Sequence, residues 1–404
     1  MQEPLASRAR TRSHAIFAVM HFALLTWLIS TASASAQSQK MVNWCIGKNN
    51  ATPEQIAQGC TAIIAAHKTK GAVLGSAYLN RGLAYKMMGD YDRALKEYNI
   101  AISLAPRFPL CYINRSAVYS ETGRYDLALA DASKAIALNP KAVLGYYNRA
   151  SVLVKQGKDR EALPDFDKAI ALDPKYGPAY NNRALAKIHL KDYDAAIADA
   201  TVAIKLVPRS GSKADHALPL GTRSDAYRGK KDYANAIKDL SAAIDLNPKP
   251  VYFGIRSGLY ELNGEPEKCL PDLARLIELT PKSFVGWQSR CWVNGMLGKL
   301  DDAMADCSKA LELAPGSSRV VSTRGDIYLK MGNYDKAIAD YDAALKIEGY
   351  TGGSQVGENA ASILYPRGLA KTKKGDQLGG AVDMTIAKRA SPDVADNYKR
   401  LLGQ

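Results

Sequence analysis

Large and small apolar residues follow one another along this chain in a pattern that repeats every 34 residues. The first copy, counted from Gly75 as position 1, has large residues at positions 4, 11 and 24 and small ones at positions 8, 20 and 27: Tyr78, Tyr85, Tyr98, Gly82, Ala94 and Ala101. Small residues let two helix axes approach closely, and the large ones fill the space between the helices. A turn at Gly89 and Asp90 separates the two apolar stretches, so each copy predicts two helices joined by a short turn.

The pattern recurs nine times and covers about three quarters of the chain. The copies begin near residues 75, 109, 143, 177, 217, 250, 284, 318 and 361. Position 32, which closes a copy, is proline in all but one: Pro106, Pro140, Pro174, Pro208, Pro248, Pro281, Pro315, Gly349 and Pro392. Proline cannot continue a helix, so it marks the connection to the next copy. A chain built in this way is a solenoid, in which each repeat packs on its neighbours.

These positions resemble those of the tetratricopeptide repeat (TPR) family, in an exported bacterial form. The resemblance implies an all-α solenoid of helix-turn-helix repeats that forms a right-handed superhelix over residues 75–392. Residues 53–67 carry the second-helix pattern alone, so we expect an N-terminal half-repeat or cap over residues 37–74. Residues 393–404 should form a capping helix, since terminal repeats must cover their apolar face. The strict 34-residue period argues against Sel1-like repeats, which tend to be longer.

Two segments break the period. Residues 209–216 lengthen one connection, and residues 349–360 form a second insertion rich in glycine and polar residues. Both are expected to be loops because such a composition makes a poor helix. They are either tolerated surface insertions or neighbours of a binding face.

A second, polar pattern runs through the same repeats. Position 7 is arginine in all nine, and position 23 is acidic in all nine. TPR proteins usually have an apolar residue at position 7, so this is a departure from the family. We expect each arginine to pair with a carboxylate of its own or the preceding repeat, in a structural ladder. The arginine and the acid of each repeat are, in order, Arg81 and Glu97, Arg115 and Asp131, Arg149 and Asp165, Arg183 and Asp199, Arg223 and Asp239, Arg256 and Asp272, Arg290 and Asp306, Arg324 and Asp340, and Arg367 and Asp383.

Asparagine stands at position 6 of four consecutive repeats: Asn80, Asn114, Asn148 and Asn182. The TPR resemblance implies that the first helix of each repeat lines a concave face and that these amides can bond the backbone of an extended peptide. An amide both donates and accepts hydrogen bonds, which suits a main-chain ligand. The alternative is that the amides merely solvate this face. Other candidate groove residues are Tyr147, Trp292, Lys86, Lys155 and Arg228.

The first 36 residues have the features of a cleaved signal peptide. Arg8, Arg10 and Arg12 precede an apolar run over residues 15–30, and the run ends before a small-residue cleavage site at Ala36. A retained membrane anchor is the alternative, although the run is short for a span. No later segment is apolar for long enough to cross a bilayer. A periplasmic or secreted location is therefore predicted.

Six cysteines fit such an oxidising location. Cys291 and Cys307 occupy positions 8 and 24 of one repeat, which face each other across the helix pair, and Cys45 and Cys60 have a similar separation in the cap. We expect two disulfides, Cys45–Cys60 and Cys291–Cys307, and the alternative is that these are buried thiols. Cys111 and the remaining cysteine, Cys269, are expected to be unpaired.

No catalytic, metal-binding or cofactor motif occurs in the sequence. The chain is therefore predicted to be a non-catalytic scaffold that binds a protein or peptide in its groove, without a cofactor and without a nucleic-acid partner. Removal of the signal peptide lowers the formal net charge from +14 to +12, and the basic residues are dispersed. The alternative function is therefore an envelope-associated binder of glycan or anionic lipid. The sequence leaves the partner and the oligomeric state open.

Overall fold

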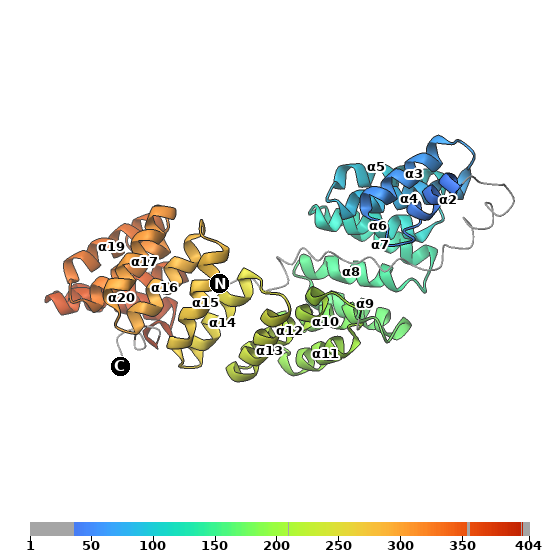
Figure 1. Cartoon of the computed structure of the whole chain (residues 1–404). Helices are drawn as coiled ribbons and strands as arrows, with labels where there is room; N and C mark the ends of the chain where they lie inside the picture. Colours follow the sequence, from blue (N-terminus) through green and yellow to red (C-terminus); the bar gives the residue numbers. More distant parts are fainter. Residues whose placement is uncertain (1–35, 209, 354–355, 397, 399–404) are drawn as a thin grey trace. The chain divides into compact units, whose positions relative to one another are not determined.

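The computed structural model describes residues 36–208, 210–353, 356–396 and 398, and every regular element in these ranges is a helix (Figure 1). The predicted signal peptide lies outside the described residues, apart from Ala36. The chain divides into two compact bodies, one up to Gly211 and one from Ser212 onward. None of the described helices is both long and apolar enough to cross a membrane.

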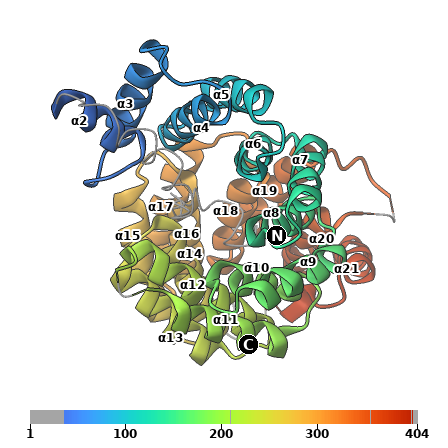
Figure 2. The ribbon, with the colours of Figure 1, turned by 90° about the vertical axis from the view of Figure 1, so that its right-hand side faces the viewer.

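In the N-terminal body, helices pair in chain order into antiparallel hairpins (Figure 2). Its helices are α2 (Ala36–Cys45), α3 (Pro53–Ala65), α4 (Gly71–Met87), α5 (Tyr91–Leu104), α6 (Pro109–Glu121), α7 (Tyr125–Leu138), α8 (Val143–Lys155), α9 (Asp159–Leu172), α10 (Gly177–His189) and α11 (Tyr193–Leu206). From α4 onward, the first helix of each hairpin is called helix A and the second helix B. Consecutive A helices also contact each other, so they line a common face, here called the helix-A face.

The C-terminal body continues the same alternation of A and B helices. Its helices are α12 (Lys213–Gly229), α13 (Tyr233–Leu246), α14 (Pro250–Leu262), the short η3 (Pro266–Lys268), α15 (Cys269–Leu279), α16 (Phe284–Met296), α17 (Leu300–Leu313), α18 (Ser318–Lys330), α19 (Tyr334–Ile347), α20 (Glu358–Lys374) and α21 (Gln377–Ala390). The all-helical repeat fold predicted from the period is thus confirmed.

Positions 8 and 24 meet in the core of each hairpin. Gly82 and Tyr98 of the first repeat are both buried, and a Cβ added to Gly82 would lie 2.6 Å from Cε1 of Tyr98. Gly325 has the same relation to Tyr341 in the eighth repeat. A small residue at position 8 is therefore needed wherever position 24 is aromatic.

The turn between helices A and B places position 15 in the left-handed backbone region in every repeat. Seven repeats have glycine there, and the other two have Lys191 and Lys231, each at φ +63°. Left-handed backbone costs glycine least, so the two lysines are the less favourable choices at this turn.

The N-terminal cap is more complete than the half-repeat predicted from the sequence. Helix α2 packs on α3, and the two are joined by the Cys45–Cys60 disulfide. A Cβ on Gly59 would lie 2.5 Å from the carbonyl oxygen of Met41, so only glycine permits this approach. The cap is therefore a helical hairpin rather than a single helix.

The prediction that both insertions are loops is wrong for residues 213–216 and 358–360, which belong to α12 and α20. Ser212 caps α12: its hydroxyl accepts from the amide of Asp215, and the Asp215 carboxylate accepts from the amide of Ser212. This reciprocal cap starts a helix despite the unfavourable composition around it. Residues 394–396 of the predicted capping helix are helical, and Val394 is buried. Most of the rest of this predicted helix lies outside the described residues.

Both expected disulfides form, with Cα–Cα distances of 4.6 Å for Cys45–Cys60 and 5.3 Å for Cys291–Cys307. All six cysteines lie in the described part of the chain, and Cys111 and Cys269 are buried thiols. Burial raises the pKa of each of these two thiols to about 12, which leaves them protonated and unreactive.

We therefore predict two free thiols per chain when the protein is denatured without reductant and titrated with a thiol reagent. Pre-treatment with a reductant should raise the count to six. A count of six without reductant would contradict both disulfides.

Candidate functional site

The arginine of each repeat is held by the acid of the same repeat. Nε and Nη2 of the position 7 arginine donate to the two carboxylate oxygens of position 23 at 2.6–3.0 Å in all nine repeats. The nine acids are at most 9% exposed. Such two-pronged pairs are strong and geometrically specific. The sequence left open whether each arginine pairs with the acid of its own repeat or of the preceding one. The structure shows that the acid belongs to the same repeat.

The third arginine nitrogen links one repeat to the next, a contact that the sequence analysis missed. Nη1 of Arg115 donates to Asn99 Oδ1 at 2.7 Å, and Nη1 of Arg183 contacts Asp167 Oδ1 at 2.5 Å. Both acceptors stand at position 25 of the preceding repeat. The same link joins Arg149 to Ser133, Arg256 to Ser241, and Arg367 to Asp342, and Arg81 reaches Thr61 of the cap. Each such arginine ties together three helices, so the ladder is structural.

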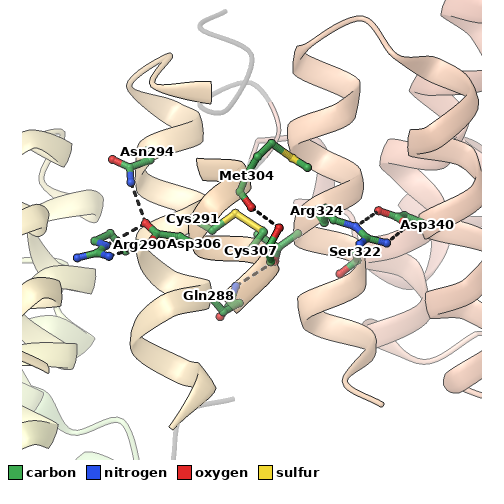
Figure 3. Close-up of a disulfide and its surroundings, with 12 residues drawn as sticks. Gln288, Arg290, Cys291, Asn294, Met304, Asp306, Cys307, Ser322, Arg324 and Asp340 are labelled. Carbon is green, nitrogen blue, oxygen red and sulfur yellow. Dashed lines mark hydrogen bonds and ion pairs between the residues drawn. A yellow bond between two sulfur atoms is a disulfide. The ribbon is translucent and has the colours of Figure 1, made fainter. Parts of the chain in front are cut away.

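The seventh repeat lacks this link because position 25 of its preceding repeat is Ala274. Nη1 of Arg290 has no hydrogen-bond partner among the described residues, while its other nitrogens bind Asp306, as Figure 3 shows. A cavity of about 630 Å³ opens there between α15, α16 and α17, and its lining includes Trp287 and Lys299. This hollow therefore lies beside the ladder at a place where the link between repeats is missing.

The asparagine row divides into two pairs. Asn148 Nδ2 donates to the carbonyl oxygen of Ile113 at 3.0 Å, and Asn182 Nδ2 donates to the Tyr147 hydroxyl at 3.0 Å. These amides therefore already join helix A of one repeat to helix A of the preceding one. Asn80 and Asn114, by contrast, make no side-chain hydrogen bond to any described residue and are only partly buried. They are the two amides of the row whose hydrogen-bonding groups are open to a ligand.

The other candidate groove residues are also engaged within the protein. Lys155 Nζ contacts Glu121 at 3.2 Å, Trp292 Nε1 donates to Glu261 Oε1 at 3.2 Å, and Arg228 pairs with Asp225 at 2.9 Å. The Tyr147 ring packs on Phe166 and Tyr176, with ring centroids 6.3 and 5.2 Å apart. Burial lowers the pKa of the remaining candidate, the Lys86 ammonium. Lys155 and Trp292 thus link neighbouring A helices, whereas Arg228 is paired within α12.

No three His, Cys, Asp or Glu side chains in the described part of the chain gather in a way that could hold a metal ion. His189 contacts Asp159 at 2.8 Å, but no nucleophile stands in that pair, so it lacks the triad arrangement of hydrolases.

Comparison with known proteins finds tetratricopeptide repeat models matching six segments: residues 75–108, 110–141, 143–176, 166–198, 220–250 and 322–349. The chain is 42% identical over 96 residues to human serine/threonine-protein phosphatase 5, a match that covers 22% of this chain. The chain spans only 19% of the length of that relative.

Among solved structures, a tetratricopeptide repeat protein from Parabacteroides merdae is 18% identical, with 73% of this chain and 98% of that chain covered and a TM-score of 0.41. PilF from Pseudomonas aeruginosa is 17% identical, with 52% and 94% covered and a TM-score of 0.45.

Proposed function

Because the chain is a tetratricopeptide repeat protein, we propose that it is a non-catalytic scaffold that binds a protein or peptide on its helix-A face in the cell envelope. The observation that carries the proposal is the pair of open amides, Asn80 on α4 and Asn114 on α6. The two helices contact each other, so the amides present donors and acceptors to one extended segment. Binding would rest on surface complementarity and main-chain hydrogen bonds, without chemical turnover.

The proposed location, periplasmic or secreted, rests on two features. Two disulfides favour an oxidising compartment, and the first 36 residues have the composition of an export signal. The alternative function, binding of glycan or anionic lipid through dispersed positive charge, has less support. Nine of the arginines are each paired with a buried acid, so their charge is largely neutralised.

Replacing Asn80 and Asn114 together with alanine should weaken partner binding at least tenfold while the helical content stays unchanged. The measurement is affinity capture from the organism's own envelope fraction by residues 37–404, with wild type and variant compared quantitatively and circular dichroism recorded for both. Asn263→Ala, the same change at an exposed turn, is the matched control and should retain the partner. Equal capture by wild type and the double variant would contradict the proposed site. Capture that falls steeply as salt rises would instead favour the polyanion binder.

A further inference from the structure

Tyr398, close to the C-terminus, lies on the helix-A face of the C-terminal body. The Tyr398 ring is 8% exposed, and its centroid lies 6.4 Å from that of Trp292 on α16 and 5.7 Å from that of Tyr365 on α20. Its hydroxyl donates to the carbonyl oxygen of Ser362, also on α20, at 2.9 Å. The tyrosine is thus held by two rings and a main-chain acceptor.

The contacts of Tyr398 reach further than capping of the last repeat requires. A cap needs to cover only the ninth repeat, built from α20 and α21, whereas Trp292 belongs to the seventh. Trp292 stands at position 9 of its repeat, and Ser362 and Tyr365 stand at positions 2 and 5 of theirs. These are positions of the face expected to receive a ligand. Tyr398 therefore lies on the kind of face on which we propose that this solenoid binds its partner.

The floor of this site has the chemistry to select a phenol. Asp326, at position 9 of α18, is buried, and the Tyr341 hydroxyl donates to its Oδ1 at 2.8 Å. Burial raises the pKa of the Asp326 carboxyl to about 8, and hydrogen bonding by the Tyr341 hydroxyl opposes that shift. Lys330, one turn further along α18, donates to the carbonyl oxygen of Met296. The carbonyl oxygen of Ser362 accepts from a hydroxyl, which tyrosine supplies and phenylalanine does not.

Aromatic neighbours give the site its shape. Trp292 meets the Tyr398 ring edge-on at 89°, while Tyr365 is tilted from it by 35°. The Trp292 ring is itself fixed by its hydrogen bond to Glu261 of the preceding repeat. Edge-on and tilted ring pairs of this kind are favourable beyond the area they bury. Trp292 is thus held by a contact that does not involve Tyr398.

We propose that this slot on α16, α18 and α20 recognises a tyrosine side chain of a partner peptide, and that Tyr398 fills it in the free protein as an intramolecular competitor. The proposal rests on the proposed function and adds the chemistry of the partner: an extended peptide that carries a tyrosine. Such a partner must displace the chain's own Tyr398. The partner's apparent affinity is therefore its intrinsic affinity multiplied by the fraction of time in which the slot is empty.

The test uses full-length Tyr398→Ala protein and a labelled synthetic peptide of residues 391–404, with binding followed by fluorescence anisotropy. The variant should bind the peptide at least tenfold more tightly than wild type, whose slot is filled. A peptide with alanine in place of its tyrosine should bind the variant at least tenfold more weakly, and one with phenylalanine should fall between the two. A variant that does not bind the tyrosine peptide, or that binds the alanine peptide equally well, overturns the proposal.

Two further variants separate recognition in the slot from simple capping. Trp292→Ala added to Tyr398→Ala should abolish peptide binding, since Trp292 lies outside the last repeat; unchanged binding overturns the proposal. Full-length Tyr398→Phe keeps the ring packing and should bind the tyrosine peptide better than wild type does; equal binding also overturns the proposal. The Asn80→Ala and Asn114→Ala changes lie in the other body and should leave peptide binding intact. Loss of partner capture through them therefore tests the proposed function separately.

Discussion

Asp199→Ala should lower the free energy of unfolding by about 3–5 kcal/mol, one of the largest effects expected of a single substitution in this chain. Asp199 is 6% exposed and accepts from three cationic nitrogens: Arg183 Nε at 2.8 Å, Arg183 Nη2 at 2.6 Å and Lys187 Nζ at 2.7 Å. Alanine at this position leaves two partly buried cations without their shared carboxylate. The cost is then chiefly the unfavourable burial of charge that has lost its partner.

The control is Asp167→Ala, which removes a different partner of the same arginine. Asp167 contacts Arg183 Nη1, but its side chain is 61% exposed, so its loss should cost less than about 1 kcal/mol. Urea unfolding followed by circular dichroism gives both values. If the two variants lose equal stability, the buried half of the ladder contributes no more than a surface ion pair.

The ladder also marks how far sequence reasoning reaches. Positions 7 and 23 could be matched because arginine and an acid recur there in all nine repeats. Position 25 was missed because its acceptors differ chemically, as amide, hydroxyl and carboxylate in Asn99, Ser133 and Asp167. Several residue types can accept this hydrogen bond, so position 25 shows no recurring residue type along the sequence.

The asparagine row shows the opposite limit. The recurrence of asparagine at position 6 was visible in the sequence. Whether each amide is free to bind a ligand depends on how closely neighbouring A helices pack. Asn148 and Asn182 reach position 5 of the preceding repeat, Ile113 and Tyr147, so their donors are already bound. Asn80 and Asn114 have the same position and a different environment. The sequence period places such side chains on a face. It does not tell whether their hydrogen-bonding groups already have a partner in the neighbouring repeat.

The contact of Tyr398 with the seventh repeat lay beyond what the period could predict. Tyr398 follows the last repeat, so no position number applies to it, and its neighbours come from helices 33 to 106 residues earlier in the sequence. Residues 213–216 were likewise misassigned, because composition outweighed a local cap that involves only Ser212 and Asp215. Repeat spacing therefore predicts neither long-range contacts such as those of Tyr398 nor local helix caps such as the one at Ser212.

The Cys291–Cys307 disulfide should contribute about 3 kcal/mol, as expected for a closed loop of roughly 15 residues. It stands at positions 8 and 24, where the first and eighth repeats pack Gly82 on Tyr98 and Gly325 on Tyr341. Replacing both cysteines with alanine should therefore cost about 2–4 kcal/mol, since it removes the cross-link and also leaves the contact poorly filled.

The repeats supply a matched control for that loss: Cys291→Gly combined with Cys307→Tyr. This variant restores the glycine–tyrosine contact of the first and eighth repeats without a covalent bond, so it should recover part of the stability that the alanine pair loses. Urea unfolding with and without dithiothreitol separates the two contributions. Reductant should destabilise wild type more than the glycine–tyrosine variant, whose remaining response reports Cys45–Cys60 alone. Equal responses in the two proteins would show that the bond at positions 8 and 24 adds nothing beyond the packing that the other repeats achieve without it.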